Sequence, residues 1–394
     1  MKVLHVVAAL AERYGGPSRN VVGLCAATRA LGVDAEICAT NADGPGGCLD
    51  VPSDEQIVWH GVPVRFFRRT WSETYKYSAP LSGWLRSRVQ DFDLIVTHGC
   101  FSFAPEAAAV AARRAGVPYL VVPHGMLAEW ALTRRRKQVH LRLRTRTLVR
   151  AARGFICTSA REEQEVARLV GHAPSTLRVN WGIPADVLAA APADGHRWRE
   201  RHGLPTGRKM VLFLGRLHPK KGIHDQLLPA MAHAPGDWLL VIAGPEDAHT
   251  PRYVDVVRRT VQEGGLADRV FFTGPLDSRE KLDALDACDV FVLPSHSENF
   301  AVTVAEAMAR ARPVIVSEAV QIADEVAAAG AGFVVPLDPP RLADALSRVL
   351  SDPGLAQSLG ASGRAFVARE LSWETAGRRV CDFYRRVLHD RAAG

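Results

Sequence analysis

Short apolar runs alternate along the chain with longer segments whose apolar residues recur at helical spacing. In the first half, these runs and the helix-like segments between them cover residues 3–10, 18–31, 34–40, 93–99, 104–115, 118–125, 154–160 and 161–170. The same alternation begins again at residues 209–217, 222–234, 237–244, 251–264, 269–274, 278–287, 289–295, 301–311 and 312–317. Continuous apolar strands that alternate with helices are typical of parallel sheets covered by helices. The pattern therefore predicts two α/β domains with parallel sheets.

The length of the chain and a polar stretch near its middle indicate how the domains divide. A chain of 394 residues is longer than a single hydrophobic core usually serves. Residues 184–208 contain Pro and Gly but little strand pattern, which favours a linker. We therefore expect one domain over 1–183 and a second that begins at residue 209. Two such domains are expected to face each other across a deep cleft at the carboxyl ends of their strands, where ligands bind.

The composition indicates an ordinary globular protein of a reducing compartment. Hydrophobic residues make up 47% of the chain and charged residues 23%, and no apolar run approaches the roughly 20 residues of a membrane span. The apolar N-terminus contains His5 and leads into a Gly-Gly turn, which favours a buried first strand over a signal peptide. The seven cysteines are scattered and include no C-x-x-C pair, so we expect a cytoplasmic protein.

Positive charge is concentrated in one segment. Residues 133–153 hold nine Lys and Arg residues and no acid, while the whole chain has a net charge of +7. Such a band suits an anionic partner, and peripheral contact with the inner face of the plasma membrane is one interpretation. A solvated helix face is the other. We expect no nucleic acid partner, because no aromatic residues interleave with the arginines.

Glycines and cations follow the first strand of each half. Gly15 and Gly16 stand at the start of a helix, where a bare backbone can approach an anionic ligand closely, although a plain turn explains them equally well. In FLGRLHPKKG, Arg216 follows one glycine and Lys221 precedes another that opens a helix. The Arg fork and the Lys point charge can together neutralise a diphosphate. Solvated loop charges are the alternative.

Two glutamates flank the start of a later helix. In PSHSENFAVTVAEAMARARPVIVS, residues 294–317, Glu298 lies in the loop after a strand and Glu306 lies one to two turns into the next helix. Ionised carboxylates only accept hydrogen bonds, which suits them to the hydroxyl groups of a sugar and a ribose. The helix N-terminus at 299–302 offers backbone N–H groups to a phosphate. A glutamate that merely stabilises the helix dipole is the alternative.

These motifs and their spacing resemble the retaining glycosyltransferase family 4, which has the GT-B fold. The pattern G-R-x4-K-G precedes P-S-x-x-E-x-F-x5-E-A, and the likeness extends over nearly the whole chain through YGGPSRN, PHGMLAEWAL, CTSAREEQEVARL, NWGIPAD, VIAGPED, VFFTG and LSWETAGRRVCDFYRRVL. The resemblance implies two Rossmann-like domains, the first for the acceptor and the second, 209–371, for a nucleotide-sugar. It also implies that residues 372–394 cross back to the first domain.

The resemblance implies roles for individual residues. Arg216 and Lys221 would hold the donor diphosphate, and Glu306 would hold the ribose hydroxyls. Glu298 would hold the donor sugar, and His124 would lie on the other wall near the reacting sugar. These residues other than Glu306 are the expected catalytic residues. The remaining positions matched to donor binding are Gly15, Gly16, Gly274, Asn299, Phe300, Ala301 and Val302.

Some positions depart from the family pattern. Ala301 stands where the family often has glycine, and the segment around Ala311 and Arg312 lacks the glycine common before the Pro-Val-Ile strand. We expect these changes to affect the identity of the donor more than the class of reaction.

No metal and no cofactor is expected. The D-F-D at 91–93 precedes an apolar strand, which indicates a strand-start turn rather than a metal site. The cations Arg216 and Lys221 can supply the electrostatic effect of a metal ion. The resemblance further implies that the leaving phosphate takes the acceptor's proton, so no protein nucleophile is needed, and the usual Ser/His/Asp and Cys/His signatures are absent.

We therefore predict a retaining, metal-independent hexosyltransferase. It would move a hexosyl group from a UDP- or GDP-hexose to a sugar or a lipid-linked acceptor, in exopolysaccharide, lipopolysaccharide or glycoconjugate synthesis. The alternatives are a glycosyltransferase for a small-molecule natural product, a nucleotide-sugar epimerase of the same fold, and a protein that binds the donor without turnover. An epimerase would need carboxylates placed to abstract a sugar proton.

Overall fold

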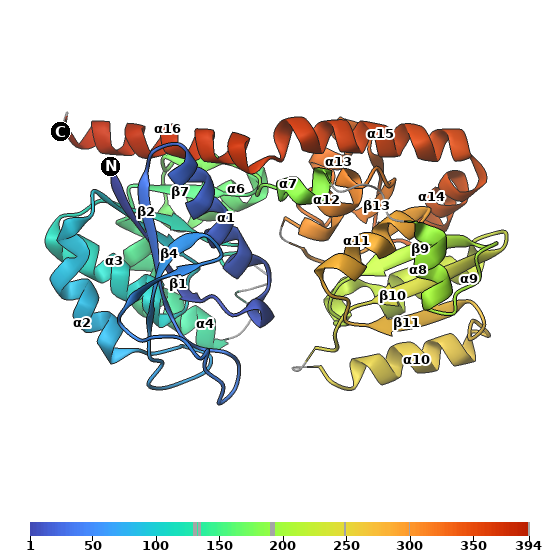
Figure 1. Ribbon diagram of the computed structural model, residues 1–394, viewed down its shortest axis with the longest axis horizontal. Coiled ribbons are helices and arrows are strands. Elements are labelled where there is room, and N and C mark those ends of the chain that lie inside the picture. Colours follow the sequence, from blue (N-terminus) through green and yellow to red (C-terminus); the bar gives the residue numbers. More distant parts are fainter. Residues whose placement is uncertain (129–131, 133–134, 190–193, 248–249, 299, 393–394) are drawn as a thin grey trace. The chain divides into compact units, whose positions relative to one another are not determined.

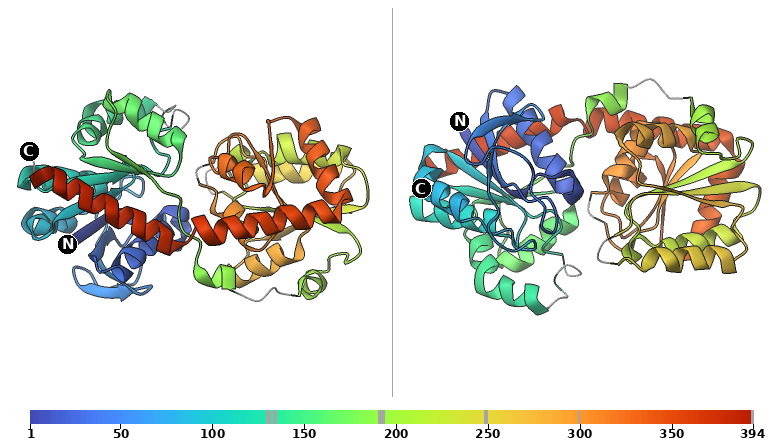
Figure 2. Two further views of the ribbon diagram at one scale, coloured as in Figure 1. Left: turned by 90° about the horizontal axis from the view of Figure 1, so that it is seen from above. Right: turned by 60° about the horizontal axis from the view of Figure 1, so that its bottom comes forward.

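The computed structural model describes residues 1–128, 132, 135–189, 194–247, 250–298 and 300–392 (Figure 1). The chain divides into two compact units, Met1–Gly182 with Trp373–Gly394, and Ile183–Ser372. Each unit is built around one sheet with α-helices packed against it (Figure 2). The α/β class with two parallel-sheet domains, which the alternating pattern predicts, is confirmed.

The first unit has an eight-stranded sheet in the order β3-β4-β2-β1-β5-β6-β7-β8. Its strands are β1 (Lys2–Ala9), β2 (Asp34–Thr40), β3 (Gln56–Trp59), β4 (Val62–Phe67), β5 (Leu94–His98), β6 (Tyr119–Val122), β7 (Gly154–Cys157) and β8 (Thr176–Arg178). All neighbours are parallel except β3, which pairs with β4 antiparallel at the sheet edge. The expectation of a purely parallel sheet is wrong at this edge, because His60 and Gly61 form a two-residue turn with positive φ that closes a hairpin.

The helices of the first unit lie on both faces of its sheet. They are η1 (Glu12–Tyr14), α1 (Gly16–Ala30), α2 (Ala79–Arg88), η2 (Val89–Asp91), α3 (Phe103–Ala115), α4 (Arg135–His140), η4 (Leu141–Thr145), α5 (Arg146–Arg150), α6 (Ala160–Val170) and α16 (Trp373–Ala392). Leu4, Ile95 and Val121 point to the face covered by α2 and α3, where they join one hydrophobic core. Asp93 directly precedes β5 and accepts a hydrogen bond from the backbone N–H of Lys2 at 2.7 Å, so this aspartate ties two strand starts together.

One tryptophan anchors α16 to the first unit. The ring of Trp373 lies against Gly23 of α1 and Gly182, and a Cβ at either glycine would overlap it. Its centroid is 6.3 Å from that of Trp181, which is fully buried. Figure 1 shows α16 running alongside α1 from this anchor. The last helix of the chain is therefore part of the unit that contains the first strand.

The second unit has a six-stranded sheet, in which all neighbouring strands are parallel, in the order β11-β10-β9-β12-β13-β14. Its strands are β9 (Lys209–Leu214), β10 (Trp238–Ala243), β11 (Val270–Gly274), β12 (Val290–Leu293), β13 (Val314–Ser317) and β14 (Gly332–Val335). Its helices are η5 (Pro219–Lys221), η6 (Ile223–Leu227), α9 (Leu228–His233), α10 (Tyr253–Glu263), α11 (Ser278–Ala287), α12 (Val302–Ala309), α13 (Ala323–Ala329), α14 (Pro339–Ser351) and α15 (Pro353–Glu370). Every residue of β10 and β12 is buried, as expected for central strands of a parallel sheet.

The segment 184–208 is not the linker that its polar composition predicts, because it belongs to the second unit. It contains α7 (Ala185–Ala189) and α8 (Gly195–Arg201), and residues 190–193 lie outside the described residues. Trp198 of α8 is fully buried, and the guanidinium of Arg199 donates to the carbonyl oxygens of Ala287 and Arg208. Trp198 and Arg199, together with the buried Val187 and Leu204, thus pack a segment that is otherwise rich in polar residues, Pro and Gly.

Candidate functional site

Each sheet has one point at which the strand order reverses. In the second sheet the chain leaves β9 toward β10 and β11, and later returns to β12 on the other side of β9. In the first sheet the same reversal falls between β1 and β5. The loops that follow two such strands diverge, and ligands of open α/β sheets bind between them at the carboxyl ends. Of the predicted site residues, Gly15 and Gly16 follow β1, Arg216 and Lys221 follow β9, and Glu298 follows β12.

The structure brings two predicted catalytic residues together beside the reversal point of the second sheet. Lys221 ends η5 in the loop after β9, and its Nζ donates to Oε2 of Glu298 in the loop after β12. The two side chains are only 11% and 16% exposed. Gly222 has a φ of 69°, and a Cβ there would overlap the carbonyl oxygen of Pro294. The two loops therefore touch at a position that only glycine fits, which holds Lys221 opposite Glu298.

Arg216 has a carboxylate partner of its own. Its Nη1 donates to Oδ2 of Asp247 at 2.9 Å, and the side chain of Asp247 is almost completely buried. Gly244, with a φ of 140°, brings the loop after β10 against the carbonyl oxygen of Gly215. Asp247 is a site residue to which the sequence analysis assigned no role, although it ends the motif VIAGPED. Its position just after the strand beside β9 is the signal that could have found it.

Glu306 lies in α12 with its carboxylate buried. Its Oε1 accepts a hydrogen bond from Nζ of Lys281 in α11, whereas Oε2 is buried and has no hydrogen-bond partner among the described residues. A buried carboxylate oxygen without a donor is costly, so this atom is suited to receive a hydrogen bond from a ligand hydroxyl. Lys281 is a second residue that sequence reasoning missed, because it lies on a different helix 25 positions away.

The start of α12 has a backbone conformation that normally needs glycine. Ala301 is the residue before the helix and has a φ of 52°, and Val302 is the first helical residue. Phe300 is buried, and Asn299 lies outside the described residues. Gly274 ends β11 with a φ of 73° and accepts a hydrogen bond from the N–H of Gly244 at 2.8 Å. Residues 300–302 thus place the N-terminus of α12 next to the loop of Glu298.

His124 follows β6 in the first unit. Its φ is 54°, its ring stacks on Trp181 at 5.4 Å, and its Nε2 lies 3.1 Å from Nδ1 of His98. Burial lowers the pKa of His124 to about 4. The following N–H, of Gly125, donates to Oε1 of Glu162 at 2.6 Å, so this buried glutamate fixes the turn that carries His124. Glu162 is a third residue that the motifs did not single out, although it lies within CTSAREEQEVARL.

Gly15 and Gly16 lie in the loop that follows β1. Gly15 has a φ of 78°, and α1 begins at Gly16. The preceding residue, Tyr14, donates from its hydroxyl to Oε1 of Glu73 at 2.6 Å and accepts from the N–H of Gly44 at 2.8 Å. Burial, followed by the hydrogen bond to Glu73, raises the pKa of Tyr14 to about 12, so it stays a donor. Tyr14 therefore ties the paired glycines to two loops of the same unit.

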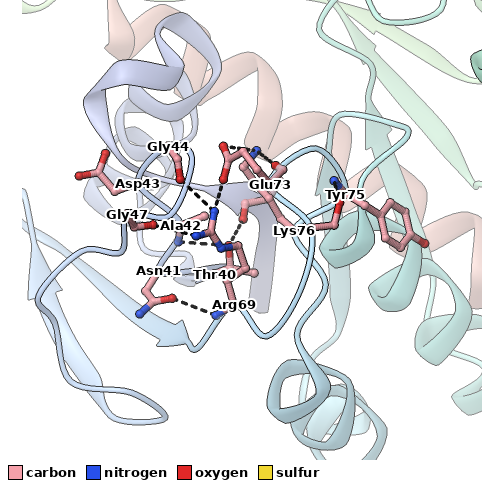
Figure 3. A network of polar contacts seen from close by, with 12 residues as sticks. Thr40, Asn41, Ala42, Asp43, Gly44, Gly47, Arg69, Glu73, Tyr75 and Lys76 are labelled. Atoms are coloured by element: carbon pink, nitrogen blue, oxygen red, sulfur yellow. Dashed lines mark hydrogen bonds and ion pairs between the residues drawn. The ribbon is translucent and has the colours of Figure 1, made fainter.

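Arg69 joins these two loops (Figure 3). Its guanidinium donates to the carbonyl oxygens of Gly44 at 3.0 Å and Gly47 at 3.1 Å, and it forms an ion pair with Glu73. Its backbone N–H donates to Oδ1 of Asn41 at 2.9 Å. The loops after β2 and β4 are therefore fixed by one buried arginine, beside the loop that carries Gly15. No sequence motif marks this residue.

The basic segment forms a helical stretch with an exposed surface. Over the described residues it consists of α4, the π-helical turn η4 and α5, while residues 133–134 lie outside them. Val139 and Leu143 are four positions apart and are 55% and 75% exposed. Arg142 and Arg146 beside them are also exposed. None of the helices in the described part of the chain has the length and apolar character needed to cross a membrane.

Metal-binding side chains do not gather within the part of the chain that the structure describes. No group of three His, Cys, Asp or Glu side chains there could hold a metal ion. The charged groups of the candidate site are the pairs Lys221–Glu298, Arg216–Asp247 and Lys281–Glu306.

Two parallel-sheet units with charged loops at their reversal points are what glycosyltransferases of the GT-B fold contain, and the comparisons with known proteins agree. Residues 194–366 match the family model described as glycosyl transferases group 1, and residues 15–181 match a glycosyl transferase 4-like domain. The chain belongs to the glycosyl transferases group 1, of the family 4 type with the GT-B fold.

The names of similar proteins specify different molecules. A D-inositol 3-phosphate glycosyltransferase of Acidothermus cellulolyticus is 29% identical over 75% of this chain and 68% of its own length. A 2-deoxystreptamine glucosyltransferase of Streptomyces kanamyceticus is 30% identical over 72% of this chain and 74% of its own length. Against four other D-inositol 3-phosphate glycosyltransferases, the chain covers 59% to 70% of the relative's length. The class of enzyme is therefore shared, while the acceptors differ.

A solved structure shares the fold over almost the whole chain. The Anabaena protein HepE, in complex with UDP and glucose, superposes with a TM-score of 0.78 at 20% identity, over 98% of this chain and all of that one. At this identity the likeness concerns the fold alone.

Proposed function

We propose that the protein is a retaining, metal-independent hexosyltransferase that takes its hexosyl group from a UDP-hexose. The observation that carries the proposal is the pair of Lys221 and Glu298 between the loops after β9 and β12. This pair places a cation and a hydrogen-bond acceptor where α/β sheets bind ligands. A nucleotide-sugar needs both, because it has an anionic diphosphate and a polyhydroxylated ring. UDP rather than GDP is proposed because HepE, which shares the fold, was solved with UDP and glucose.

Each charged group has a proposed part in the transfer. Lys221 and Arg216 neutralise the charge that develops on the diphosphate as the bond from the anomeric carbon to the phosphate oxygen breaks. The N-terminus of α12 adds backbone N–H groups for the phosphate. The acceptor oxygen forms its bond to the anomeric carbon on the same face, and its proton passes to the leaving phosphate oxygen. No protein base and no metal ion is required.

The two carboxylates, Glu298 and Glu306, fix the position of the donor through hydrogen bonds. Glu298 accepts hydrogen bonds from hydroxyl groups of the hexose, and Oε2 of Glu306 accepts from a ribose hydroxyl. Glu306 suits this part because that oxygen is buried and has no hydrogen-bond partner among the described residues. The proposal does not include an epimerase, because each carboxylate already accepts a hydrogen bond from a lysine, Glu298 from Lys221 and Glu306 from Lys281.

A small polyhydroxylated acceptor fits best. D-inositol 3-phosphate and 2-deoxystreptamine, in the names of the two relatives above, are both small cyclic molecules with several hydroxyl groups. This favours the small-molecule alternative of the sequence analysis over a lipid-linked sugar in exopolysaccharide, lipopolysaccharide or glycoconjugate synthesis.

Transfer in solution tests the proposal. The purified protein is incubated with UDP-glucose and EDTA, together with D-inositol 3-phosphate, 2-deoxystreptamine or a polyprenyl diphosphate sugar, and the products are followed by mass spectrometry. We expect a monoglycosylated product of one small acceptor, with proton NMR showing the anomeric configuration of the donor. An inverted product, or transfer that needs added magnesium, would contradict the proposed mechanism.

Contact with an anionic membrane is a second candidate, favoured by the exposed Val139 and Leu143 within the basic segment. Apolar side chains one helical turn apart and flanked by arginines are typical of helices that lie in a membrane interface. Sedimentation with phosphatidylglycerol vesicles at low salt tests it. We expect Arg142→Glu/Arg146→Glu to lose sedimentation, while the control Arg113→Glu/Arg114→Glu, on exposed positions of α3, keeps it. Equal sedimentation of both variants would mean that the basic segment is a solvated helix face. A soluble acceptor would then be favoured.

A further inference from the structure

Three buried histidines form a hydrogen-bonded row in the first unit. Nδ1 of His5 lies 3.0 Å from Nε2 of His98, and Nδ1 of His98 lies 3.1 Å from Nε2 of His124. The three side chains are 0%, 2% and 8% exposed. Only His124 falls in a motif of the family. The other two need an explanation, because a buried imidazole without function is readily replaced by an apolar side chain.

The sheet register explains why the three rings meet. His5 of β1 is opposite Val96 of β5, and His98 of β5 is opposite Val122 of β6. Residues opposite each other in a parallel pair point to the same face, and so do residues two positions apart along a strand. His5 and His98 therefore point to one face of the sheet, and the ring of His124, which follows the end of β6, reaches Nδ1 of His98. That face is opposite the core that α2 and α3 cover.

The two hydrogen bonds allow only two arrangements of protons. A neutral imidazole has one N–H and one lone pair, so the bonds must all run in one direction. If they run from His5 to His124, each ring carries its proton on Nδ1. If they run the other way, each ring carries it on Nε2.

One buried nitrogen distinguishes the two arrangements. Nε2 of His5 is buried and has no hydrogen-bond partner among the described residues. In the second arrangement it would be an orphaned buried N–H, the rarer and more costly kind of unsatisfied group. In the first arrangement it is a bare lone pair. The first arrangement leaves His124 with an N–H on Nδ1, the nitrogen that does not face His98.

We propose that His5 and His98 are positioning residues that hold the proton of His124 on Nδ1, so that His124 presents an N–H to a hydrogen-bond acceptor of a bound substrate and does not act as a base. The inference rests on the proposed function for the identity of the ligand. It assigns parts to two residues of β1 and β5 that touch neither donor nor acceptor.

The surroundings of the row keep it neutral. Burial lowers the pKa of His5 to about 3 and of His124 to about 4, and it also lowers the pKa of His98, with His5 and His124 as further causes. Of the ionisable groups nearby, Tyr384 of α16 lies with its ring 6.5 Å from that of His5, and burial raises its pKa, so it is neutral too. Glu162 reaches the N–H of Gly125 rather than the ring of His124, and burial raises its pKa as well. Among the residues that the structure describes, no charged partner therefore favours an imidazolium.

Side-chain nitrogen NMR tests the proposal directly on the full chain. Protein with 15N-labelled histidine is examined by long-range proton–nitrogen correlation, and the signals of His124 are assigned by comparison with His124→Asn. We expect Nδ1 of His124 to carry the proton in the wild-type protein. A proton on Nε2, or a doubly protonated ring at pH 7, would overturn the proposal.

Two substitutions of His5 test the relay, by which the hydrogen bonds of the row hold the proton of His124 on Nδ1. Asn places its amide near the position of Nδ1 and can still donate to His98, whereas Leu cannot. We expect His5→Leu to give a mixture of His124 tautomers and to slow nucleotide release from the donor about tenfold through kcat, while His5→Asn keeps both properties near wild type. The control His172→Leu, at an exposed position of the same unit, should change neither. Unchanged tautomer and kcat in His5→Leu would contradict the relay.

The two levels of the proposal fail separately. If no nucleotide-sugar binds, the proposed function fails while the tautomer of His124 can still be as assigned. If a donor binds and turns over but the proton is on Nε2, only the relay fails.

Discussion

Nζ of Lys221 donates to Oε2 of Glu298, joining the loops that follow β9 and β12 at the reversal point of the second sheet. Each side chain thus satisfies the other at the place proposed for the donor. A nucleotide-sugar can replace this pairing, because its diphosphate offers charge to the lysine and its hydroxyl groups offer donors to the glutamate. The ion pair therefore holds the two charges in a defined arrangement.

Removing the lysine should slow the transfer strongly. We expect Lys221→Ala to lower kcat/KM for release of nucleotide from the donor by about 30- to 1,000-fold, as for the loss of one preorganised electrostatic group worth about 2–4 kcal/mol. Lys209→Ala is the matched control, because this lysine lies at the opposite end of β9 and pairs with Asp289. Equal kcat/KM values of the two variants would show that Lys221 does not belong to the donor site.

Removing the buried glutamate of α12 should weaken donor binding more than turnover. Oε2 of Glu306 is buried, has no hydrogen-bond partner among the described residues, and is the atom proposed to accept from a ribose hydroxyl. We expect Glu306→Ala to raise the dissociation constant of UDP roughly tenfold or more, the typical effect of a lost hydrogen bond to a charged group. Isothermal titration with UDP measures it, with the exposed Glu263→Ala of α10 as control. A loss of kcat at unchanged UDP affinity would contradict the assignment to the ribose.

Two alanines should be stabilised by replacement with glycine. Ala301 and Ala311 have φ angles of 52° and 55°, a conformation that costs an L-residue about 1 kcal/mol or more. Because glycine also gains freedom in the unfolded chain, we expect Ala311→Gly and Ala301→Gly each to raise the free energy of unfolding in urea by roughly 0.5 kcal/mol. Ala328→Gly, in the exposed interior of α13, should lower it by about 0.5–1 kcal/mol. A lower free energy of unfolding in all three glycine variants would show that the backbone at Ala301 and Ala311 is not strained.

The contact between the two donor-site loops should tolerate no side chain at Gly222. Both Gly222 and Gly236 have positive φ, but a Cβ at Gly222 would overlap the carbonyl oxygen of Pro294, whereas nothing lies within 4 Å of one at Gly236. Gly236→Ala therefore measures backbone strain alone, about 1 kcal/mol. We expect Gly222→Ala to be clearly less stable than Gly236→Ala in urea, and to bind UDP more weakly. Similar effects of the two substitutions would mean that the loops can move apart freely.

The histidine row should make the protein less stable in acid. Histidines in the unfolded chain titrate near pH 6.5, whereas the pKa of folded His5 is about 3 and that of His124 about 4. The unfolded state therefore binds more protons between these values, so this stability is complete above pH 6.5 and is lost as the pH falls toward 4. Glu162 acts in the opposite direction, because burial raises its pKa.

Urea unfolding at pH 7 and pH 5 measures this loss. We expect the free energy of unfolding to be lower at pH 5 by on the order of 2 kcal/mol for each buried histidine. His5→Asn should remove about one third of the loss contributed by the row. A loss as large in that variant as in the wild-type protein would show that His5 does not contribute to it.

The sequence was most informative where both faces of a strand are buried. Continuous apolar runs such as 209–217 and 237–244 identify central strands because both faces of those strands are covered. The edge strand β3 was missed because its side chains are only partly buried and its pattern is short. The segment 184–208 was misinterpreted because only a few scattered side chains, among them Val187, Trp198, Arg199 and Leu204, are buried there and they form no strand pattern.

Site residues could be predicted where they belong to a short motif of neighbouring residues. Lys221 and Glu298 stand in local motifs, and the structure places them in contact. Asp247, Lys281 and Glu162 could not be found in the same way, because each reaches its partner from another strand or helix. The row of histidines depends on the register of three strands, which the sequence of any one of them does not contain.

Binding of the donor is the most direct test of the proposed site. The thermal unfolding midpoint of the purified protein is measured in EDTA with UDP-, GDP-, ADP- and dTDP-hexoses, for the wild type, Lys221→Ala and Lys209→Ala. We expect one UDP-hexose at 100 times its dissociation constant to add about 2.7 kcal/mol of stability to the wild type and to Lys209→Ala, and much less to Lys221→Ala. No shift with any donor, or an equal shift in all three proteins, would contradict a nucleotide-sugar site at Lys221 and Glu298.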